Sequence, residues 1–513
     1  MSPDQAYNEL LAQLRRMALI ESTLEVLAWD ELTLMPDAAT EHRGGQLAHL
    51  TGLHHALAVD PRIDDWLAAI EGTPLVADSH SPATVNVREA RRQHQRLSRQ
   101  PRSLVEELAR VTTAAQQEWK LARAASDYSH FEPWLAAIVT LKGEQAQCLA
   151  GGAAEHPFDL YDSLLAEYEP GLLTRDVAAM LAALSRELTT LLPEVLEMQA
   201  RSGAANESPR LKGQFPEPEQ RRLCKWLASA VGFDFRRGQL DTAVHPFSTH
   251  LGPHDIRMAI RCNEGDLRES IYALLHETGH ALYDQGLPPQ HFGTPAGDAI
   301  SLGVHESQAR LWEIAVGKSR GFWQFFLPHA AAEFPAAFAA ARPQQLWREV
   351  NRVQPGVQRV GADEVTYNLH IVLRFELEQA LLARDLQTGD VPAAWKERQQ
   401  ALLGIAPADD RTGCLQDGHW AAGMFGYFPT YTIGNVLAAQ IHERAAADLV
   451  DLPSQFAVGD FHPLREWLAA NIYRLGKRLT TAELCQALCS DNLNSSVLIA
   501  SLRRKHAELW SAS

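Results

Sequence analysis

The sequence contains no long apolar run and few cysteines, and each absence excludes a class of protein. Nowhere do about 18 apolar residues follow one another, so we expect no transmembrane helix. Six cysteines among 513 residues are too few and too scattered for a disulfide framework. The N-terminal stretch MSPDQAYNELLAQLRRMALI contains acids and lacks the apolar centre of a secretory signal. We therefore expect a cytoplasmic protein without membrane association.

Positive charge is also scarce. Lys and Arg total 47 against 63 acids, which gives a formal net charge of −16. Binding to nucleic acid depends on clustered cations, so this balance argues against a nucleic-acid partner. The excess of acid is typical of a soluble surface. With 46% hydrophobic residues, the chain can still bury a large core.

Helical periodicity dominates the sequence. Through the first two hundred residues, apolar side chains recur every three or four positions among Ala, Leu, Glu, Arg and Gln. Short breaks are predicted at Thr73-Pro74, Glu132-Pro133 and Glu169-Pro170-Gly171. The polar stretch 202–220 is predicted to form a long loop or a hinge.

One segment departs from this pattern. Residues 238–262, GQLDTAVHPFSTHLGPHDIRMAIRC, alternate and turn in the manner of short strands, which predicts a small sheet or hairpin. Helical patterning resumes at Asp266 and is expected to continue nearly to the end of the chain. The predicted fold class is therefore mainly α, with one small β element beside the helix described next.

Residues 266–286, DLRESIYALLHETGHALYDQG, are predicted to form a well-bounded helix. Asp266 is a suitable N-cap, with Glu269 in the capping-box position, and Gly286 is a suitable C-terminal stop. One side of this helix is mostly apolar. That side comprises Leu267, Ile271, Leu274, Leu275, Thr278 and Leu282.

The opposite side of this helix carries a metal-binding motif, HETGH. His276 and His280 lie four residues apart, so their imidazoles project from one face and can bind one ion. Glu277 lies beside them, where it can reach a water molecule at the metal and act as the catalytic base. The spacing predicts a zinc-dependent peptide hydrolase. The alternative is a pair of histidines that are only solvated or hydrogen-bonded.

Such a site needs a third protein ligand, so that one coordination position remains for water. Glu306, in the segment SLGVHESQARLWE, fits a site of two histidines and one glutamate. No HExxHxxGxxH extension follows His280, which argues against a third histidine of that kind. By spacing alone, the alternatives to Glu306 are His305, Asp298 and His291.

A series of further motifs, in order over residues 245–435, resembles the thermostable, Taq-carboxypeptidase-type metallocarboxypeptidases. The matching motifs are HPF at 245–247, DIR at 255–257, HETGH at 276–280, HESQ at 305–308, RVGAD at 359–363, GCLQDGHW at 413–420 and GYFPTYTIGN at 426–435. Ala259, Gln358 and Cys262 depart from the usual pattern of this family. None of the three is a proposed metal ligand or the proposed base. We therefore expect these departures to affect local packing and substrate preference, not the reaction.

The resemblance implies a large helical body with a deep substrate groove, formed by a single catalytic domain over residues 1–513. In that domain, a helical region covers about 1–200, and the metal and substrate motifs cover about 245–435. The resemblance implies zinc bound by Glu306 together with the two histidines; Co²⁺ and Mn²⁺ are substitutes that the same ligands accept. It also implies a homodimer and the release of single C-terminal residues, with broad specificity, from peptides with a free C-terminus.

The resemblance also implies roles for residues outside the metal motif. Tyr431 and His419 are the implied donors to the oxyanion, with Tyr427 as a weaker candidate. Arg359 is the implied partner of the substrate's free carboxylate, because a guanidinium pairs with a carboxylate through two bonds. Residues implied to line the same groove are Arg257 and His245.

Two other functions fit parts of the sequence. A metal-dependent oligopeptidase or dipeptidase would share the metal motif but cut internal bonds or release dipeptides. A catalytically inactive, peptide-binding helical scaffold would have lost a ligand or the base. The three proposed ligands and the proposed base are all present in this chain.

Overall fold

A computed structural model describes residues 1–151, 157–202, 211–489 and 491–510. The chain is mainly helical with one small sheet, which confirms the predicted fold class. Contacts between Cα atoms divide it into two compact units. Unit 1 comprises Met1–Leu97, Ser208–Val350 and Ala438–Ser490, and unit 2 comprises Ser98–Glu207, Asn351–Leu437 and Asp491–Ser513. The organisation as a single catalytic domain stays a prediction.

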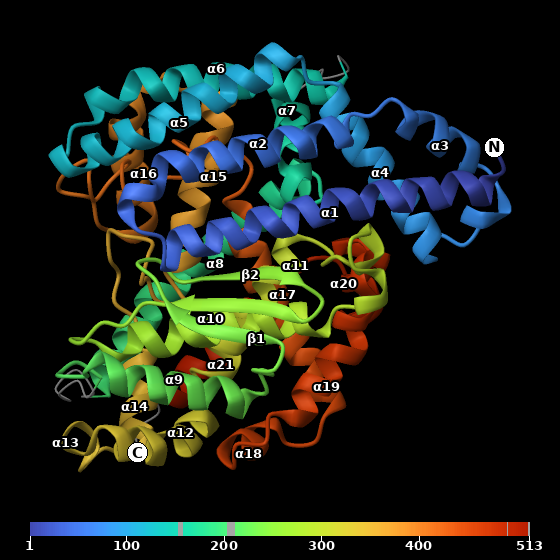
Figure 1. Ribbon diagram of the computed structural model, residues 1–513. Helices are drawn as coiled ribbons and strands as arrows, with labels where there is room; N and C mark the ends of the chain where they lie inside the picture. The colour runs from blue at the N-terminus through green and yellow to red at the C-terminus, as the bar shows by residue number, and fades with distance from the viewer. Residues whose placement is uncertain (152–156, 203–210, 490, 511–513) are drawn as a thin grey trace. The chain divides into compact units, whose positions relative to one another are not determined.

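Unit 1 contains the sheet and most of the helices (Figure 1). Its elements are α1 (Pro3–Thr33), η1 (Asp37–Ala39), α2 (Thr40–Ala58), α3 (Arg62–Ile70), η2 (Pro74–Val76), α4 (Pro82–Ser98, ending at the boundary), α9 (Glu217–Val231), β1 (Gly238–Thr242), β2 (Phe247–Gly252), β3 (Asp255–Ile260), α10 (Leu267–Gly286), η4 (Pro289–His291), η5 (Pro295–Gly297), α11 (Leu302–Arg310), the π-helical turn η6 (Leu311–Val316), α12 (Arg320–Glu333), α13 (Pro335–Phe338), α14 (Pro343–Val350), α18 (Leu452–Ala457), α19 (His462–Asn471), η8 (Tyr473–Arg478) and α20 (Thr481–Cys489).

Unit 2 is built from helices and two long irregular segments. Its elements are α5 (Arg102–Ala125), α6 (Tyr128–Ala150), α7 (Pro157–Tyr168), α8 (Thr174–Arg201), α15 (Tyr367–Ala383), η7 (Thr388–Asp390), α16 (Val391–Leu403), the first part of α17 (Pro429–Asp448, which continues into unit 1) and α21 (Ser495–Trp510). The irregular segments are 351–366 and 404–428.

The predicted small β element is a three-stranded sheet in the order β1-β3-β2. β1 pairs with β3 in parallel, and β2 pairs with β3 antiparallel, with an irregularity between His250 and Gly252. α10 packs against β2 and β3, and α1 packs against β2 (Figure 1). The sheet therefore supports the helix that carries the HETGH motif.

α10 is buried along most of its length. All six positions of its predicted apolar side are buried. Asp266 caps the helix as predicted, and its side chain accepts a hydrogen bond from the backbone N–H of Arg268. A helix enclosed on most sides fixes the direction of every side chain along it, which is the precondition for a precise metal site.

Two details of this helix differ from the prediction. The predicted capping box does not form, because the Glu269 carboxylate accepts from Asn263 Nδ2 at 2.8 Å. Gly286 is not a stop beyond the helix but its last residue, and Leu287 is the C-cap. A Cβ at Gly286 would lie 2.5 Å from the Tyr473 ring, so close packing, not backbone conformation, is the reason for glycine.

Two predictions about the helical pattern are also wrong. Pro133 does not break a helix but lies within α6, whereas the breaks at 73–74 and 169–171 are confirmed. Helix does not continue from Asp266 to the end of the chain, since 351–366 and 404–428 are irregular. Glycines with positive φ at 361, 423 and 426 shape these segments.

The predicted loop at 202–220 is described only in part. Residues 203–210 lie outside the described residues, 211–216 are irregular, and α9 begins at Glu217. All six cysteines are free. Within the described parts of the chain, no helix combines the length and the hydrophobicity that crossing a membrane requires.

Candidate metal centre and a buried polar cluster

The HETGH helix and the following helix approach closely at one glycine. A Cβ at Gly279 would lie 2.5 Å from Ala309 Cα and from the Gln308 carbonyl oxygen. Any larger residue would therefore push α11 away from α10. Ser301 caps α11, with its hydroxyl accepting from the backbone N–H of Val304, and the next turn carries Glu306.

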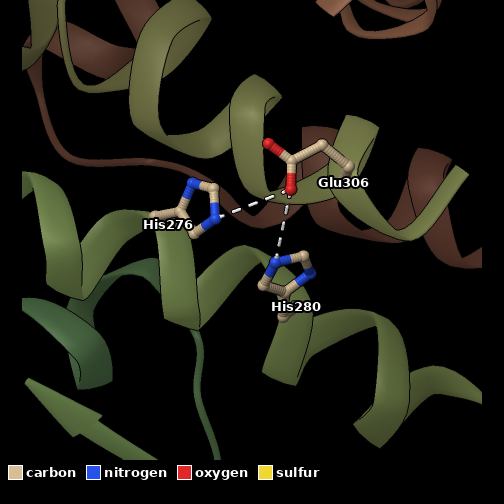
Figure 2. A group of neighbouring side chains, drawn as sticks. All are labelled: His276, His280 and Glu306. Carbon is tan, nitrogen blue, oxygen red and sulfur yellow. Dashed lines mark ion pairs between the residues drawn. The ribbon is translucent and has the colours of Figure 1, made fainter. Parts of the chain in front are cut away.

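Three side chains converge where these helices meet. Glu306 Oε2 lies 3.7 Å from His276 Nε2 and 3.8 Å from His280 Nε2. One ligand atom from each residue lies within 4.8 Å of the other two. Figure 2 shows a Glu306 oxygen facing a nitrogen of each ring, with the histidines on one helix and the glutamate on another. Two imidazole nitrogens and a carboxylate oxygen are a donor set that binds zinc and leaves one position open.

The other ring nitrogen of His276 faces a carboxylate directly. Its Nδ1 lies 3.0 Å from Glu313 Oε2, which also accepts from Arg310 Nη1 at 2.7 Å. Glu313 comes from the π-helical turn after α11, a conformation found often at functional sites. Because a carboxylate only accepts, the His276 proton is held on Nδ1, and Nε2 is free for a metal.

The other ring nitrogen of His280 faces a second imidazole. Its Nδ1 lies 2.5 Å from His305 Nδ1, and His305 Nε2 lies 3.1 Å from Asp284 Oδ1. Asp284 is buried and lies one turn after His280 on α10. His305 therefore contacts a candidate ligand instead of completing the group of three.

The electrostatics of the centre favour a cation. Burial alone would lower the pKa of His276, but Glu306 and the hydrogen bond to Glu313 raise it to about 9. Burial would raise the pKa of Glu313, but Arg310 and His276 lower it to about 2. A histidine that binds a proton this firmly lies in a strongly negative surrounding, in which a divalent cation can replace the proton. The residues therefore fit a metal ion.

Glu277 lies between the two histidines in sequence and is 6% exposed. Burial raises its pKa from 4.5 to about 7; His276 opposes the rise, and Glu306 adds to it. A carboxyl group with a pKa near neutrality can both accept and return a proton. This property suits Glu277 to the role of general base.

A second polar cluster lies within unit 2 and centres on Asp417. Its Oδ1 accepts from Arg359 Nη2 at 2.8 Å, and its Oδ2 accepts from Arg374 Nε at 2.7 Å. All three side chains are buried, with at most 9% of each exposed. Burial would raise the pKa of Asp417, but Arg374 and Arg359 hold it well below its usual range. Two guanidinium groups and one carboxylate leave an excess of positive charge.

The implied oxyanion donors lie against Arg359. His419 Nε2 is 3.1 Å from the Tyr431 hydroxyl, and the Arg359 guanidinium lies 4.8 Å from the centre of the Tyr431 ring. The Tyr427 ring is 5.5 Å from His419 and 5.3 Å from Tyr431. Four residues singled out from the sequence are thus gathered within one unit.

The irregular segment 404–428, which carries His419, is held by a buried acid. Glu378 on α15 accepts from the Trp420 ring N–H at 2.9 Å, from the Tyr161 hydroxyl at 2.7 Å and from the Gly426 backbone N–H at 3.1 Å. Burial raises the pKa of Glu378 to about 7. These bonds anchor Trp420 and Gly426, the residues that follow His419 and precede Tyr427.

Other residues named from the sequence lie elsewhere. Arg257 on β3 pairs with Asp255 at 2.7 Å, and His245 is exposed between β1 and β2. Asp363, the last residue of the RVGAD motif, precedes α15 and accepts from the backbone N–H groups of Val365 and Thr366. His291 lies in η4 and Asp298 follows η5, and neither belongs to the group formed by the two histidines and Glu306.

Sequence reasoning missed several polar partners. Asp284 lies four residues after His280, and Glu313 lies seven after Glu306, so helical spacing could have indicated both. Arg374 and Glu378 carry no such signal, because a buried charge on a helix resembles a solvated one until its partners are known.

A mainly helical fold in which the two histidines of an HExxH motif meet a glutamate is typical of a metal-dependent peptide hydrolase. The sequence model of the family described as Carboxypeptidase Taq (M32) metallopeptidase matches residues 9–506. The chain belongs to this family, and it is a metallocarboxypeptidase.

Named relatives cover nearly the whole chain. Thermostable carboxypeptidase 1 of Thermus thermophilus is 42% identical over 99% of this chain and 100% of its own length. Carboxypeptidase 1 of Bacillus subtilis is 30% identical over 98% of each chain. The crystal structure of the M32 carboxypeptidase from Deinococcus radiodurans, 34% identical, has a TM-score of 0.92 and covers 99% of this chain and 100% of that one. Trypanosoma cruzi metallocarboxypeptidase 1, 32% identical, has a TM-score of 0.93 over 98% of this chain and 99% of that one.

The buried state of His419 predicts a pH dependence of stability. Burial lowers its pKa from 6.5 to about 4; Asp417 opposes this change and Arg359 adds to it. The folded state therefore takes up the proton less readily than the unfolded state. The contribution of His419 to the free energy of unfolding is complete above pH 6.5 and is lost as pH falls toward 4.

Urea unfolding at pH 7 and pH 5 measures this effect. We expect the free energy of unfolding of His419→Gln to fall less than that of the wild type when the pH is lowered from 7 to 5. An equal loss in both proteins would contradict the assignment of a neutral, buried His419.

Proposed function

We propose that this chain is a zinc-dependent carboxypeptidase that releases single C-terminal residues from peptides with broad specificity. His276, His280 and Glu306 are the proposed ligands, and Glu277 is the proposed base. The convergence of the three ligand atoms within 4.8 Å is the observation that carries the proposal. Co²⁺ and Mn²⁺ can substitute, because they accept the same ligand types.

Glu277 performs the proton transfers of the reaction. The bound metal supplies Lewis-acid activation of water and of the scissile carbonyl. Glu277 accepts a proton from the attacking water and returns it to the leaving amine. A pKa raised by burial to about 7 supports both steps, since the group is neither a strong acid nor fully ionised near neutral pH.

The cluster in unit 2 is the proposed recognition site for the substrate carboxylate. Arg359 presents a buried guanidinium whose Nε and Nη2 donate to Asp417 and whose Nη1 donates to the Tyr367 hydroxyl. A guanidinium has five N–H donors, so two remain for a carboxylate. Tyr431 and His419 are the proposed donors to the developing oxyanion, with Tyr427 beside them.

Finer properties implied by the family resemblance remain proposals. Arg257, which pairs with Asp255, and His245, which is exposed between β1 and β2, are proposed to line the substrate groove. A homodimer and a cytoplasmic location are likewise proposed. The substrate class is a peptide with a free C-terminus.

Glu277→Gln tests the catalytic base. The amide keeps the size of the side chain but cannot accept a proton, so we expect kcat to fall by about 10²- to 10⁴-fold. Zinc content, measured by elemental analysis, should stay at the wild-type level. Glu269→Gln is the matched control, because it removes an exposed carboxylate from the same helix and should leave kcat unchanged.

Retention of zinc with a kcat near the wild-type value would reject Glu277 as the base. Loss of zinc together with activity would instead give Glu277 a role in holding the metal. Elemental analysis therefore separates the two roles.

Arg359→Ala tests recognition of the free C-terminus. Charge-assisted hydrogen bonds contribute about 1.5–3 kcal/mol, so we expect kcat/KM for a peptide with a free C-terminus to fall by at least about tenfold. The amidated peptide should be a poor substrate for the wild type and for the variant alike. Arg411→Ala removes an exposed arginine of the same unit and serves as the control.

Mass spectrometry of the products completes this experiment. Unchanged kcat/KM in Arg359→Ala would remove Arg359 from carboxylate recognition. Cleavage of the amidated peptide, or release of dipeptides, would favour the oligopeptidase or dipeptidase alternative over the carboxypeptidase.

A further inference from the structure

The two candidate histidine ligands are supported in different ways. On His276, Nδ1 meets the carboxylate of Glu313 directly at 3.0 Å. On His280, Nδ1 meets the imidazole of His305 at 2.5 Å, and only the far nitrogen of that ring meets a carboxylate, Asp284, at 3.1 Å. An imidazole is therefore inserted between the second ligand and its carboxylate.

The series of hydrogen bonds from His280 through His305 to Asp284 has a fixed donor-to-acceptor direction. For Nε2 of His280 to bind a metal it must hold a lone pair, so the ring proton must lie on Nδ1. His305 Nδ1 must then accept a hydrogen bond from His280 Nδ1–H, and this places the ring proton of His305 on Nε2. A carboxylate has no proton to donate, so Asp284 fixes the direction of both bonds.

Packing against neighbouring side chains holds these three hydrogen-bonded residues in place. The rings of His280 and His305 have centroids 4.6 Å apart, and the Tyr283 ring lies 5.2 Å from His305. Asp284 is 8% exposed. It lies one helical turn from His280, and His305 immediately precedes Glu306 on α11. A single relay therefore joins the two helices that supply the three candidate ligands.

We propose that Asp284, acting through His305, is a positioning residue that holds His280 in its metal-binding tautomer. The inference rests on the proposed function, in which His280 binds the metal. It assigns a role to His305, whose spacing made it a rival for the third ligand position. It also gives a reason for a buried acid at Asp284.

Zinc affinity tests the relay without reference to activity. Competition with a chelator gives the Kd for Zn²⁺ in the full chain, and the visible spectrum of the Co²⁺-loaded protein reports the ligand geometry. Loss of a partner behind a ligand histidine typically weakens metal binding by about 10- to 100-fold. We expect such a loss in His305→Phe, which removes both ring nitrogens, and a smaller one in Asp284→Asn, whose amide can also donate and so reverse the relay.

A conservative variant separates positioning from packing. The side-chain carbonyl of His305→Gln can accept from His280 Nδ1, so this variant should bind Zn²⁺ more tightly than His305→Phe and retain a Co²⁺ spectrum closer to the wild type. Glu269→Gln, on the same helix, should match the wild type in both measurements. The thermal midpoint of each metal-free variant shows that it is folded.

Zn²⁺ affinities of Asp284→Asn and His305→Phe within about threefold of the wild type, well short of the expected loss, would overturn the proposal. If His305→Phe does not fold, the Zn²⁺ affinities of Asp284→Asn and His305→Gln are compared instead. The relay requires Asp284→Asn to bind Zn²⁺ more weakly than His305→Gln. Failure of the wild type itself to bind Zn²⁺ would be a failure of the proposed function, which this design distinguishes from a failure of the relay.

Discussion

The close approach of α10 and α11 at Gly279 is the constraint on which the rest of the site depends. A Cβ there would lie 2.5 Å from the backbone of the facing helix, so only glycine permits the contact. A glycine inside a helix normally costs about 0.5–1 kcal/mol relative to alanine. The benefit here is that the backbone of α11 approaches closely enough to bring Glu306, and with it His305, to the two histidines of α10.

Each of the two units carries a buried polar cluster, and the two clusters differ in the sign of their excess charge. In unit 1, carboxylates outnumber cations around the histidines, so His276 binds a proton tightly in the absence of a metal. In unit 2, Arg359 and Arg374 share one carboxylate, Asp417, which leaves positive charge in a buried place. A buried charge of this kind is costly unless an anion balances it, and in the proposed function the substrate carboxylate is that anion.

The sequence predicted the parts of this molecule that depend on local spacing. The HETGH helix, its N-cap and the small sheet follow from short-range patterns. Spacing indicated Glu306 as the third ligand, and the motif resemblance strengthened that prediction. The same patterns failed where packing decides. Gly286 was mistaken for a stop because its contact with Tyr473 is distant in sequence, and 404–428 was expected to be helical although a buried Glu378 holds it in an irregular path. The buried charges Arg374 and Glu378 become recognisable only once the chain is folded, because their role depends on which side chains face them.

Anomalous X-ray scattering at the zinc absorption edge, from crystals grown with Zn²⁺, tests the central claim most directly. The account predicts one strong peak bonded to Nε2 of His276, Nε2 of His280 and a carboxylate oxygen of Glu306, at about 2.0–2.2 Å from each. A zinc peak bonded to other residues, or a peak at this place bonded to His305 in place of Glu306, would contradict it.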